Sequence, residues 1–586
     1  MPPSTTWLQN ARSNYMFAKT LTENYQDSEE EPYRSKYAAR TRLMTMLDAV
    51  DRFLEEGNLE NYSPVRLLSI LLNLEIGVID QETEELSTGE QHLTKAKALC
   101  EEWYPDDNLV IVLRLNILNQ LSYLYTMRAD YEKALSILQE AQAYFEKWTT
   151  FKSNINGEET KKIRTVIEFL DCFEYNLNEK VQDSNGEVNL DKTFTQTLYF
   201  LAQVYEKMGD SAKSAVYCYR TLKKQLILNH YKTLEWCINT ATLSQYFAGI
   251  DKFGISSHLL RVAKAMMDSK LPPKNDDDED LKKGRADFQR IMVKYYLMLL
   301  DCSSRQHTSE ESEKTNGQKP LQEQEKVEEY RLLEEDELNR MSCSPIIDKL
   351  VEFGNFDQAK AIFVEAQKLL NLAKEYYTLN EHASDYVDCI QDHSKLYRHL
   401  SSFDFDVDRK CKMYKRRVDM LEEILKEINP KHFMAQCRQI WFELGEAYNE
   451  MYEMKVSKEK DQVTTSAKKL NSLLKKSTEH FVAFIDSFRE NKNEPIPPKV
   501  PDEMVKPLII AYFGAGRNYT KILTADKKDV ISNWNKCEEF YSQAVKYIDN
   551  NPDQKSQAQI ELDLIQEMRE LIPKRIMMIA GANMMA

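Results

Sequence analysis

A pattern of large and small residues that occurs twice between Thr197 and Ala263 constrains this chain more than any other feature of its sequence. The first copy consists of Leu201, Ala202, Tyr205, a turn at Gly209–Asp210, Ser214, Cys218 and Thr221. The second copy consists of Leu243, Ser244, Phe247, Phe253, Ser256, Leu260 and Ala263. Small residues at these offsets allow the two helices of a hairpin to pack closely. Because one hairpin cannot bury its apolar face alone, we expect further copies on either side.

These offsets match those of a tetratricopeptide repeat. The 586 residues include only 15 Gly and 17 Pro, which favours long helices over sheets or barrels. Further copies follow the same slots at Leu121–Ala141, in Leu67–Ala98, around Leu444–Tyr448 and at Ala515–Ala544. We therefore predict an all-α fold, a right-handed tetratricopeptide-like helical solenoid in two halves joined by a long linker helix.

Breaks in the repeat pattern predict three parts. Residues 1–268 form an N-terminal solenoid with an insertion at 152–189 whose middle, Lys161–Leu177, is a helix. Residues 269–344 hold an acidic loop, the linker helix Leu281–Cys302, a disordered stretch Arg305–Gln318 and a further helix Leu321–Asn339. Residues 345–586 form a C-terminal solenoid, in which the prolines of Glu494–Pro507 predict irregular structure.

The net charge of −16 disfavours a general nucleic-acid binder and a polybasic membrane binder. It suits either a partner with a basic face or solubility alone. The longest apolar run, Leu67–Ile79, is interrupted by Asn73 and Glu75, so we expect no membrane insertion. Arg12 and Lys19 precede the first acid, as in a mitochondrial transit peptide. An ordinary first helix and a cytoplasmic location are the favoured interpretation, with a mitochondrial association as the lesser alternative.

No group of residues predicts an enzyme, a metal site, a cofactor or a small-molecule substrate. The ten cysteines lack a Cys-x-x-Cys pair, and Phe513–Asn518 lacks the glycines of a phosphate loop. His393 fits a helix surface or a core better than a catalytic base, because no nucleophile motif accompanies it. The basic stretch Arg409–Arg417 is interpreted as a solvated face that pairs with acids at 404–408, and the alternative is a contact for an acidic partner.

The remaining candidate is a groove. A stack of helical hairpins presents the first helix of each repeat on its concave wall, which can bind peptides or helices. Beside the core slots of the central copies stand uncharged hydrogen-bonding groups and one aromatic residue: Phe200, Gln203, Gln225, Thr242 and Gln245. These side chains suit a partner helix. The alternative is that Phe200 belongs to the core and the glutamines are merely exposed.

Several strings of sequence closely resemble the kinesin family binding protein family, also called the KIF-binding protein family. They are ETEELSTGEQHL (82–93), LYFLAQVY (198–205), WCINTATLSQY (236–246) and RKCKMYKRRVDML (409–421), together with 31–37 and 391–393. The resemblance covers nearly the whole chain. It implies a non-catalytic protein that grips kinesin motor domains in its concave groove and blocks their attachment to microtubules. It also implies roles in microtubule organisation, axon outgrowth and organelle transport, in the cytoplasm and on the cytoskeleton.

The family's contact positions fall here on the same five residues. Phe200 stands where the family motif has Tyr, so a hydroxyl bond is absent at that position. A competing hypothesis is a tetratricopeptide scaffold or cargo adaptor that binds a peptide without inhibiting a motor. A scaffold that recognises an acidic peptide needs a Lys/Arg clamp on its groove wall, and the central positions offer Gln, Phe and Thr instead.

Overall fold

A computed structural model describes residues 5–23, 27–56, 64–105, 110–153, 186–272, 278–313, 327–341, 346, 356–458, 467–489 and 496–581. Within these ranges the secondary structure consists of α-helices and two short 3₁₀ helices, and no strand occurs. The predicted all-α fold is therefore confirmed. The predicted helix at 161–177 lies outside the described residues.

Contacts within the chain divide it into two units, Met1–Tyr246 and Phe247–Ala586. Unit 1 comprises α1 (Thr5–Glu23), α2 (Arg34–Glu56), α3 (Pro64–Glu82), α4 (Leu86–Trp103), α5 (Ile111–Met127), α6 (Tyr131–Ser153), α8 (Gly186–Lys207), α9 (Ser211–Ile227) and most of α10 (Thr233–Gly249). The division at 268 and 344 stays a prediction.

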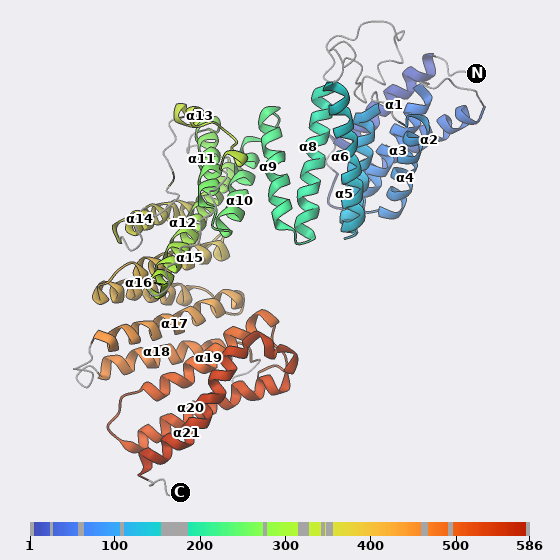
Figure 1. Ribbon diagram of the computed structural model, residues 1–586. Coiled ribbons are helices and arrows are strands. Elements are labelled where there is room, and N and C mark those ends of the chain that lie inside the picture. Colours follow the sequence, from blue (N-terminus) through green and yellow to red (C-terminus); the bar gives the residue numbers. More distant parts are fainter. Residues whose placement is uncertain are drawn as a thin grey trace. The chain divides into compact units, whose positions relative to one another are not determined.

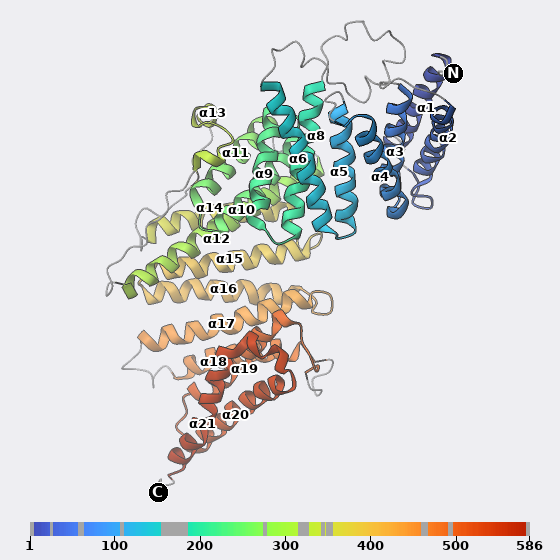
Figure 2. The same cartoon turned by 45° about the vertical axis from the view of Figure 1, so that its right-hand side comes forward.

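Helices of unit 1 pack on their neighbours in chain order, from α1 against α2 to α8 against α9, and both ribbon views show them side by side (Figures 1 and 2). The small slots of the repeats lie at these contacts. Ala134, Leu138 and Ala141 of α6 are fully buried, as the repeat pattern predicts. This packing of each hairpin on the next is the arrangement of a helical solenoid.

Unit 2 begins with the last residues of α10. It continues with α11 (Phe253–Lys270), α12 (Glu279–Glu313), the 3₁₀ helix η3 (Val327–Tyr330), α13 (Glu335–Arg340), α14 (Phe356–Tyr376), α15 (Ala383–Ser402) and α16 (Val407–Glu427). It then contains α17 (Met434–Lys458), α18 (Ala467–Asp486), α19 (Asp502–Lys521), α20 (Lys527–Asn550), the 3₁₀ helix η4 (Pro552–Ala558) and α21 (Gln559–Ala580). The long helix expected from the sequence is α12, and it packs on α14 and α15. From α14 to α21 each helix again packs on the next.

Two predictions in the middle of the chain were wrong. Residues Arg305–Glu313 of the predicted disordered stretch continue α12, because Glu, Gln and Arg are strong helix formers and Arg305 pairs with Asp301 one turn earlier at 3.1 Å. The rest of that stretch, 314–318, lies outside the described residues. The continuous helix predicted over Leu321–Asn339 is absent from the described residues 327–334. There the backbone N of Leu332 donates to Nε2 of His258 at 3.2 Å, which ties the segment to α11 in an irregular conformation.

The prediction of irregular structure up to Pro507 was also wrong, because α19 begins at Asp502 and contains this proline. A proline within a helix removes one hydrogen bond and costs about 3 kcal/mol. Val505, Leu508 and Ile509 surround it in sequence and are fully buried. Burial of each such side chain contributes about 1.5–3 kcal/mol, so the packing outweighs the proline.

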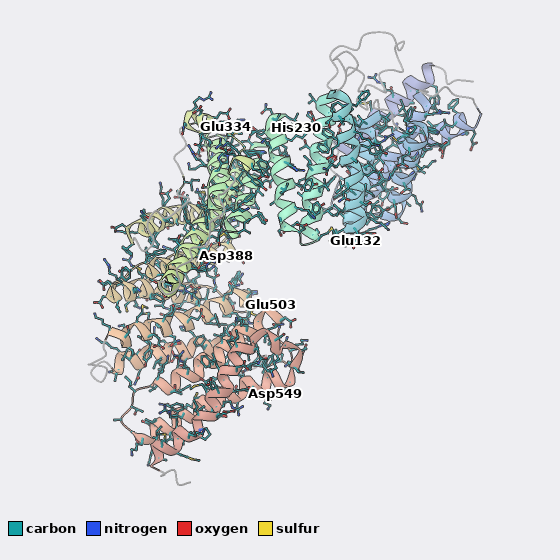
Figure 3. All side chains as sticks on the ribbon, viewed as in Figure 1. Glu132, His230, Glu334, Asp388, Glu503 and Asp549 are labelled. Atoms are coloured by element: carbon teal, nitrogen blue, oxygen red, sulfur yellow. The ribbon has the colours of Figure 1, made fainter. Side chains whose placement is uncertain are left out.

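Acidic side chains lie mainly on the outer faces of the helices. Glu132, Glu503 and Asp549 are exposed examples (Figure 3). Asp388 is exposed as well, and it accepts a hydrogen bond from Arg290 of α12 at 2.9 Å. These four carboxylates are therefore presented to solvent.

Candidate functional site

The turn between α8 and α9 sets the geometry of the central hairpin. Gly209 has a φ of +81°, in the left-handed region that favours glycine. Asp210 caps α9, since its side chain accepts a hydrogen bond from the backbone N of Lys213 at 3.0 Å. Across the hairpin the rings of Tyr205 and Tyr217 stack with centroids 5.5 Å apart. The predicted Gly-Asp turn is thus present and holds α9 against α8.

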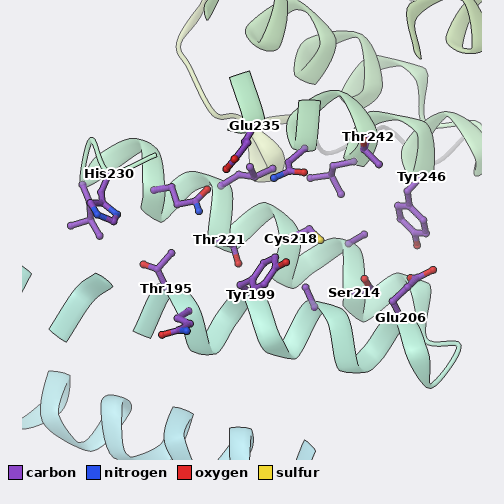
Figure 4. A pocket seen from close by; sticks show the side chains of 18 of the residues that line it. Thr195, Tyr199, Glu206, Ser214, Cys218, Thr221, His230, Glu235, Thr242 and Tyr246 are labelled. Atoms are coloured by element: carbon purple, nitrogen blue, oxygen red, sulfur yellow. The ribbon is translucent and has the colours of Figure 1, made fainter. Parts of the chain in front are cut away.

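A cavity of about 890 Å³ lies among α8, α9 and α10, within unit 1. Its lining includes three small polar residues of α9, Ser214, Cys218 and Thr221 (Figure 4). Ser214 and Thr221 are buried and α9 packs closely on α8, as the repeat pattern predicts, and both residues also border the cavity. Trp236 of α10 is buried, and its indole N–H donates to the carbonyl O of Leu222 at 3.1 Å, which fixes α10 on α9. The volume falls in the range of about 300–1,000 Å³ typical of binding pockets.

Three aromatic side chains and one amide form a surface that adjoins this cavity. We call it the aromatic wall: Tyr123 of α5 with Tyr199, Phe200 and Gln203 of α8. The ring of Phe200 contacts both tyrosines, with centroids 5.7 Å from Tyr123 and 5.8 Å from Tyr199. Gln203 Nε2 donates to the hydroxyl of Tyr199 at 2.6 Å. Tyr199 is 46% exposed and Tyr123 40% exposed. Exposed tyrosines with an apolar body and a polar end are enriched at protein interfaces.

The five residues predicted from the sequence fall on these two adjoining surfaces, with one exception. Gln225 and Thr242 line the cavity, from α9 and α10. Phe200 and Gln203 belong to the aromatic wall, which meets the cavity at Tyr199. Gln245 is half-buried on α10 and is not among the residues that line the cavity. Phe200 itself is half-buried and also packs on the core of α6 and α8. Whether the five residues bind a partner stays a prediction.

Tyr123 and Tyr199 were not identified from the sequence as part of the candidate binding surface, although the position of each in the sequence indicates it. Tyr123 follows Leu121–Ser122, so in its repeat it takes the slot that Gln203 and Gln245 take in the two central copies. Tyr199 precedes Gln203 by four residues, which places both on one face of a helix. A comparison of equivalent slots across repeats would have found Tyr123.

The groups around the cavity have the chemistry of a contact surface. Burial raises the pKa of the Cys218 thiol, which keeps it protonated and a weak nucleophile at neutral pH. Glu206, Glu235 and Lys192 also line the cavity and carry charges of both signs. In the described part of the chain, no group of three or more His, Cys, Asp or Glu is placed to hold a metal ion. Nor does any described helix combine the length and the apolar character needed to cross a bilayer.

His393 lies in the core of unit 2. Of the two positions predicted for it, a helix surface or a core, the structure shows the core. Its ring nitrogen Nε2 lies 3.0 Å from Nε2 of Gln367, and its ring stacks on Tyr397 with centroids 5.2 Å apart. Burial lowers the pKa of His393 to about 4. The imidazole is therefore neutral at physiological pH.

Arg409 of the basic stretch on α16 pairs with the neighbouring acids, as predicted, whereas Arg417 departs from the predicted solvated face. Arg409 donates to Asp404 at 2.7 Å, and its Nε lies 3.6 Å from Oδ2 of Asp406. Arg417 is 2% exposed, and its Nη2 donates to Oε1 of Glu443 at 3.1 Å. Its placement on a solvated face was wrong, because it falls on the same side of α16 as the buried residues 414, 418 and 421.

Comparisons with known proteins assign the chain to a family. The family described as "KIF-1 binding protein C terminal" matches residues 234–579. The KIF-binding protein of Gallus gallus is 32% identical over 97% of this chain and 96% of its own length. That of Homo sapiens is 28% identical over 95% of this chain and 96% of its own. The solved structure "Cryo-EM map of KIFBP" covers 98% of both chains with a TM-score of 0.57 at 23% identity, which supports a shared fold. The chain therefore belongs to the KIF-binding protein family.

Proposed function

We propose that this chain is a non-catalytic protein that binds kinesin motor domains and blocks their attachment to microtubules. The observation that carries the proposal is the similarity to relatives named KIF-binding protein over nearly their whole length. In this proposal the aromatic wall and the adjoining cavity form the motor contact. The protein acts in the cytoplasm and on the cytoskeleton, where it controls microtubule organisation, axon outgrowth and organelle transport.

The chemistry of the surface supports a helical segment of the motor as the bound element. Tyr123, Tyr199 and Phe200 offer apolar rings, while Gln203 and Thr242 offer uncharged hydrogen-bonding groups beside them. Apolar anchors with adjacent polar groups suit an amphipathic helix laid against a groove. The net charge of −16 complements a motor surface that is basic because it binds acidic tubulin. Higher ionic strength should then slow association, and a salt-independent affinity would remove charge complementarity as a driver.

A titration of the purified chain with a kinesin motor domain tests the binding surface. Replacing Tyr199 and Gln203 together with alanine removes the exposed ring and its hydrogen-bond partner. Truncation of a central aromatic anchor typically costs about 2 kcal/mol or more, so we expect at least a roughly 30-fold weaker affinity. Tyr37→Ala is the matched control, since Tyr37 of α2 is 41% exposed and donates to Glu85 at 3.0 Å. Equal affinities of the folded wall variant and the wild type would exclude the aromatic wall as the contact.

The second candidate is a scaffold or cargo adaptor that binds a peptide and leaves the motor free to engage microtubules. Clamps for acidic peptides use several cations on the groove wall. Around this cavity Lys192 is accompanied by Glu206 and Glu235, which disfavours an acidic peptide. A motor that binds the chain and still binds microtubules would favour this second candidate.

A further inference from the structure

Helix α21 exposes a line of apolar side chains on its outer face. Its inner face packs on α19 and α20 and buries Leu562, Ile565 and Ile572. On the opposite face, four apolar residues are exposed: Ile560 by 72%, Leu564 by 45%, Leu571 by 45% and Met578 by 61%. Their spacing of four, seven and seven residues places them within about 40° of one another around the helix. The terminal helix of a helical repeat array normally has a polar outer face. This exposed apolar line therefore indicates a surface that binds a partner.

Charges along α21 are separated by sign. Residues 559–568 contain Glu561, Asp563 and Glu567 and no Lys or Arg, and Arg569 and Glu570 follow at the middle of the helix. Lys574 and Arg575 lie in the second half, and residues 571–580 contain no Asp or Glu. Glu567 and Lys574 flank the apolar line, as charged residues flank the seam of paired helices. The helix is therefore acidic over residues 559–568 and basic over residues 571–580.

We propose that α21 is a homodimer interface, in which this helix packs antiparallel on α21 of a second copy of the chain. In that arrangement Ile560 faces Met578 of the second copy, and the leucines meet between them. The acidic half of each helix then lies beside the basic half of the other. A parallel pair would instead place like charges together. The same patch meets itself across a two-fold axis, which closes the assembly at two chains.

The size of the contact predicts a concentration-dependent dimer. The line from Ile560 to Met578 is ~27 Å long at 1.5 Å per residue. One pair of helices of this length buries less than the roughly 1,200–2,000 Å² of a standard interface. We therefore expect monomers and dimers in exchange. This inference does not depend on the proposed kinesin binding, because α21 belongs to unit 2 and the aromatic wall to unit 1.

Sedimentation of the chain of residues 1–586 from about 1 to about 100 µM tests the interface, a range that brackets micromolar dissociation constants. We expect the weight-average mass to rise towards that of two chains. Leu564→Glu with Leu571→Glu should weaken the dimer at least tenfold while leaving the thermal melting curve unchanged. Ile227→Glu is the matched control, because Ile227 at the end of α9 is 74% exposed and lies outside the interface. A wild-type chain that stays monomeric throughout, or a double variant that dimerises like the wild type, would overturn the proposal.

Charge reversal tests the antiparallel direction. Lys574→Glu with Arg575→Glu makes the basic segment 571–580 acidic, and Asp563→Lys with Glu567→Lys reverses two of the three acidic residues of segment 559–568. Each variant alone should lose self-association, and an equimolar mixture should regain the two-chain mass. A mixture that stays monomeric would exclude the charge-matched antiparallel pair. Variants that each dimerise as the wild type does would exclude it as well.

Discussion

Replacing Gly445 with alanine should loosen the packing of α17 on α18, because this glycine gives the ring of Phe481 its space. A Cβ at position 445 would lie 2.6 Å from both Cδ1 and Cε1 of Phe481. The ring has no room to retreat, since a Cβ at Gly514 on its other side would lie 2.7 Å from Cε2. The hydroxyl of Ser477 donates to the carbonyl O of Gly445 at 2.6 Å and holds the two helices at this separation. One ring is thus enclosed by two backbones.

Two opposing contributions set the change in the free energy of unfolding that Gly445→Ala causes. Alanine is a better helix former than glycine by about 1 kcal/mol. Overpacking of a well-filled core costs about 1–3 kcal/mol. A contact at 2.6 Å is far below the 3.4–4 Å of ordinary van der Waals contact, which places the overpacking near its upper range. We therefore expect Gly445→Ala to lower the free energy of unfolding of this region by about 1–2 kcal/mol.

Hydrogen exchange of the α18 amides measures this loss locally. A loss of 1–2 kcal/mol raises the population of the open state, and with it the exchange rate, by roughly 5–30-fold. Phe481→Leu in the same chain removes the ring and should restore part of the protection. Gly249→Ala is the control, because apart from its chain neighbours and the backbone of its own helix no heavy atom lies within 4 Å of its added Cβ. Exchange in Gly445→Ala as slow as in the wild type would refute the packing argument.

Three further predictions concern buried charge, pH and the binding surface. Arg417→Ala should destabilise the fold by about 3–5 kcal/mol, because it leaves a largely buried carboxylate unpaired; denaturant unfolding measures this, and an equal loss in the exposed control Arg416→Ala would contradict it. Burial lowers the pKa of His393 to about 4 from its ordinary 6.5, so its contribution to stability is full above pH 6.5 and is lost as the pH falls towards 4. His393→Gln should flatten this part of the stability profile, by up to roughly 3 kcal/mol, and an unchanged profile would argue against the assignment. Gln203→Ala with Gln245→Ala should weaken motor binding by about tenfold without a change in melting temperature, whereas normal binding by the folded variant would remove both residues from the contact.

Much of the fold could be predicted from the sequence because the same spacing of buried residues recurs in each copy of the repeat. The slots assigned to Cys537, Tyr541 and Ala544 from their offsets are fully buried in α20. The predicted long helix is α12, and the predicted Gly-Asp turn has the left-handed glycine that such a turn requires. Each slot depends on neighbours in sequence, so local spacing is sufficient to find it.

Features that depend on contacts between distant segments could not be predicted. The irregular backbone at Leu332 results from its hydrogen bond to His258, which lies 74 residues earlier. The cavity results from the relative placement of three helices, so the sequence identified Gln225 and Thr242 on its lining but not Tyr199, which joins it to the aromatic wall. Gln245 shares the sequence slot of Gln203, but Gln203 belongs to the aromatic wall through its bond to Tyr199, whereas Gln245 on α10 lies neither on that wall nor on the cavity lining.

Co-sedimentation of a kinesin motor domain with microtubules, in a non-hydrolysable nucleotide state, tests the proposed motor inhibition most directly. The motor alone should pellet with the microtubules. With the wild-type chain in excess, the motor should move to the supernatant together with the chain, and the Tyr199→Ala, Gln203→Ala variant should leave it in the pellet. A motor that pellets together with the wild-type chain would contradict the blocking of attachment and favour a cargo adaptor.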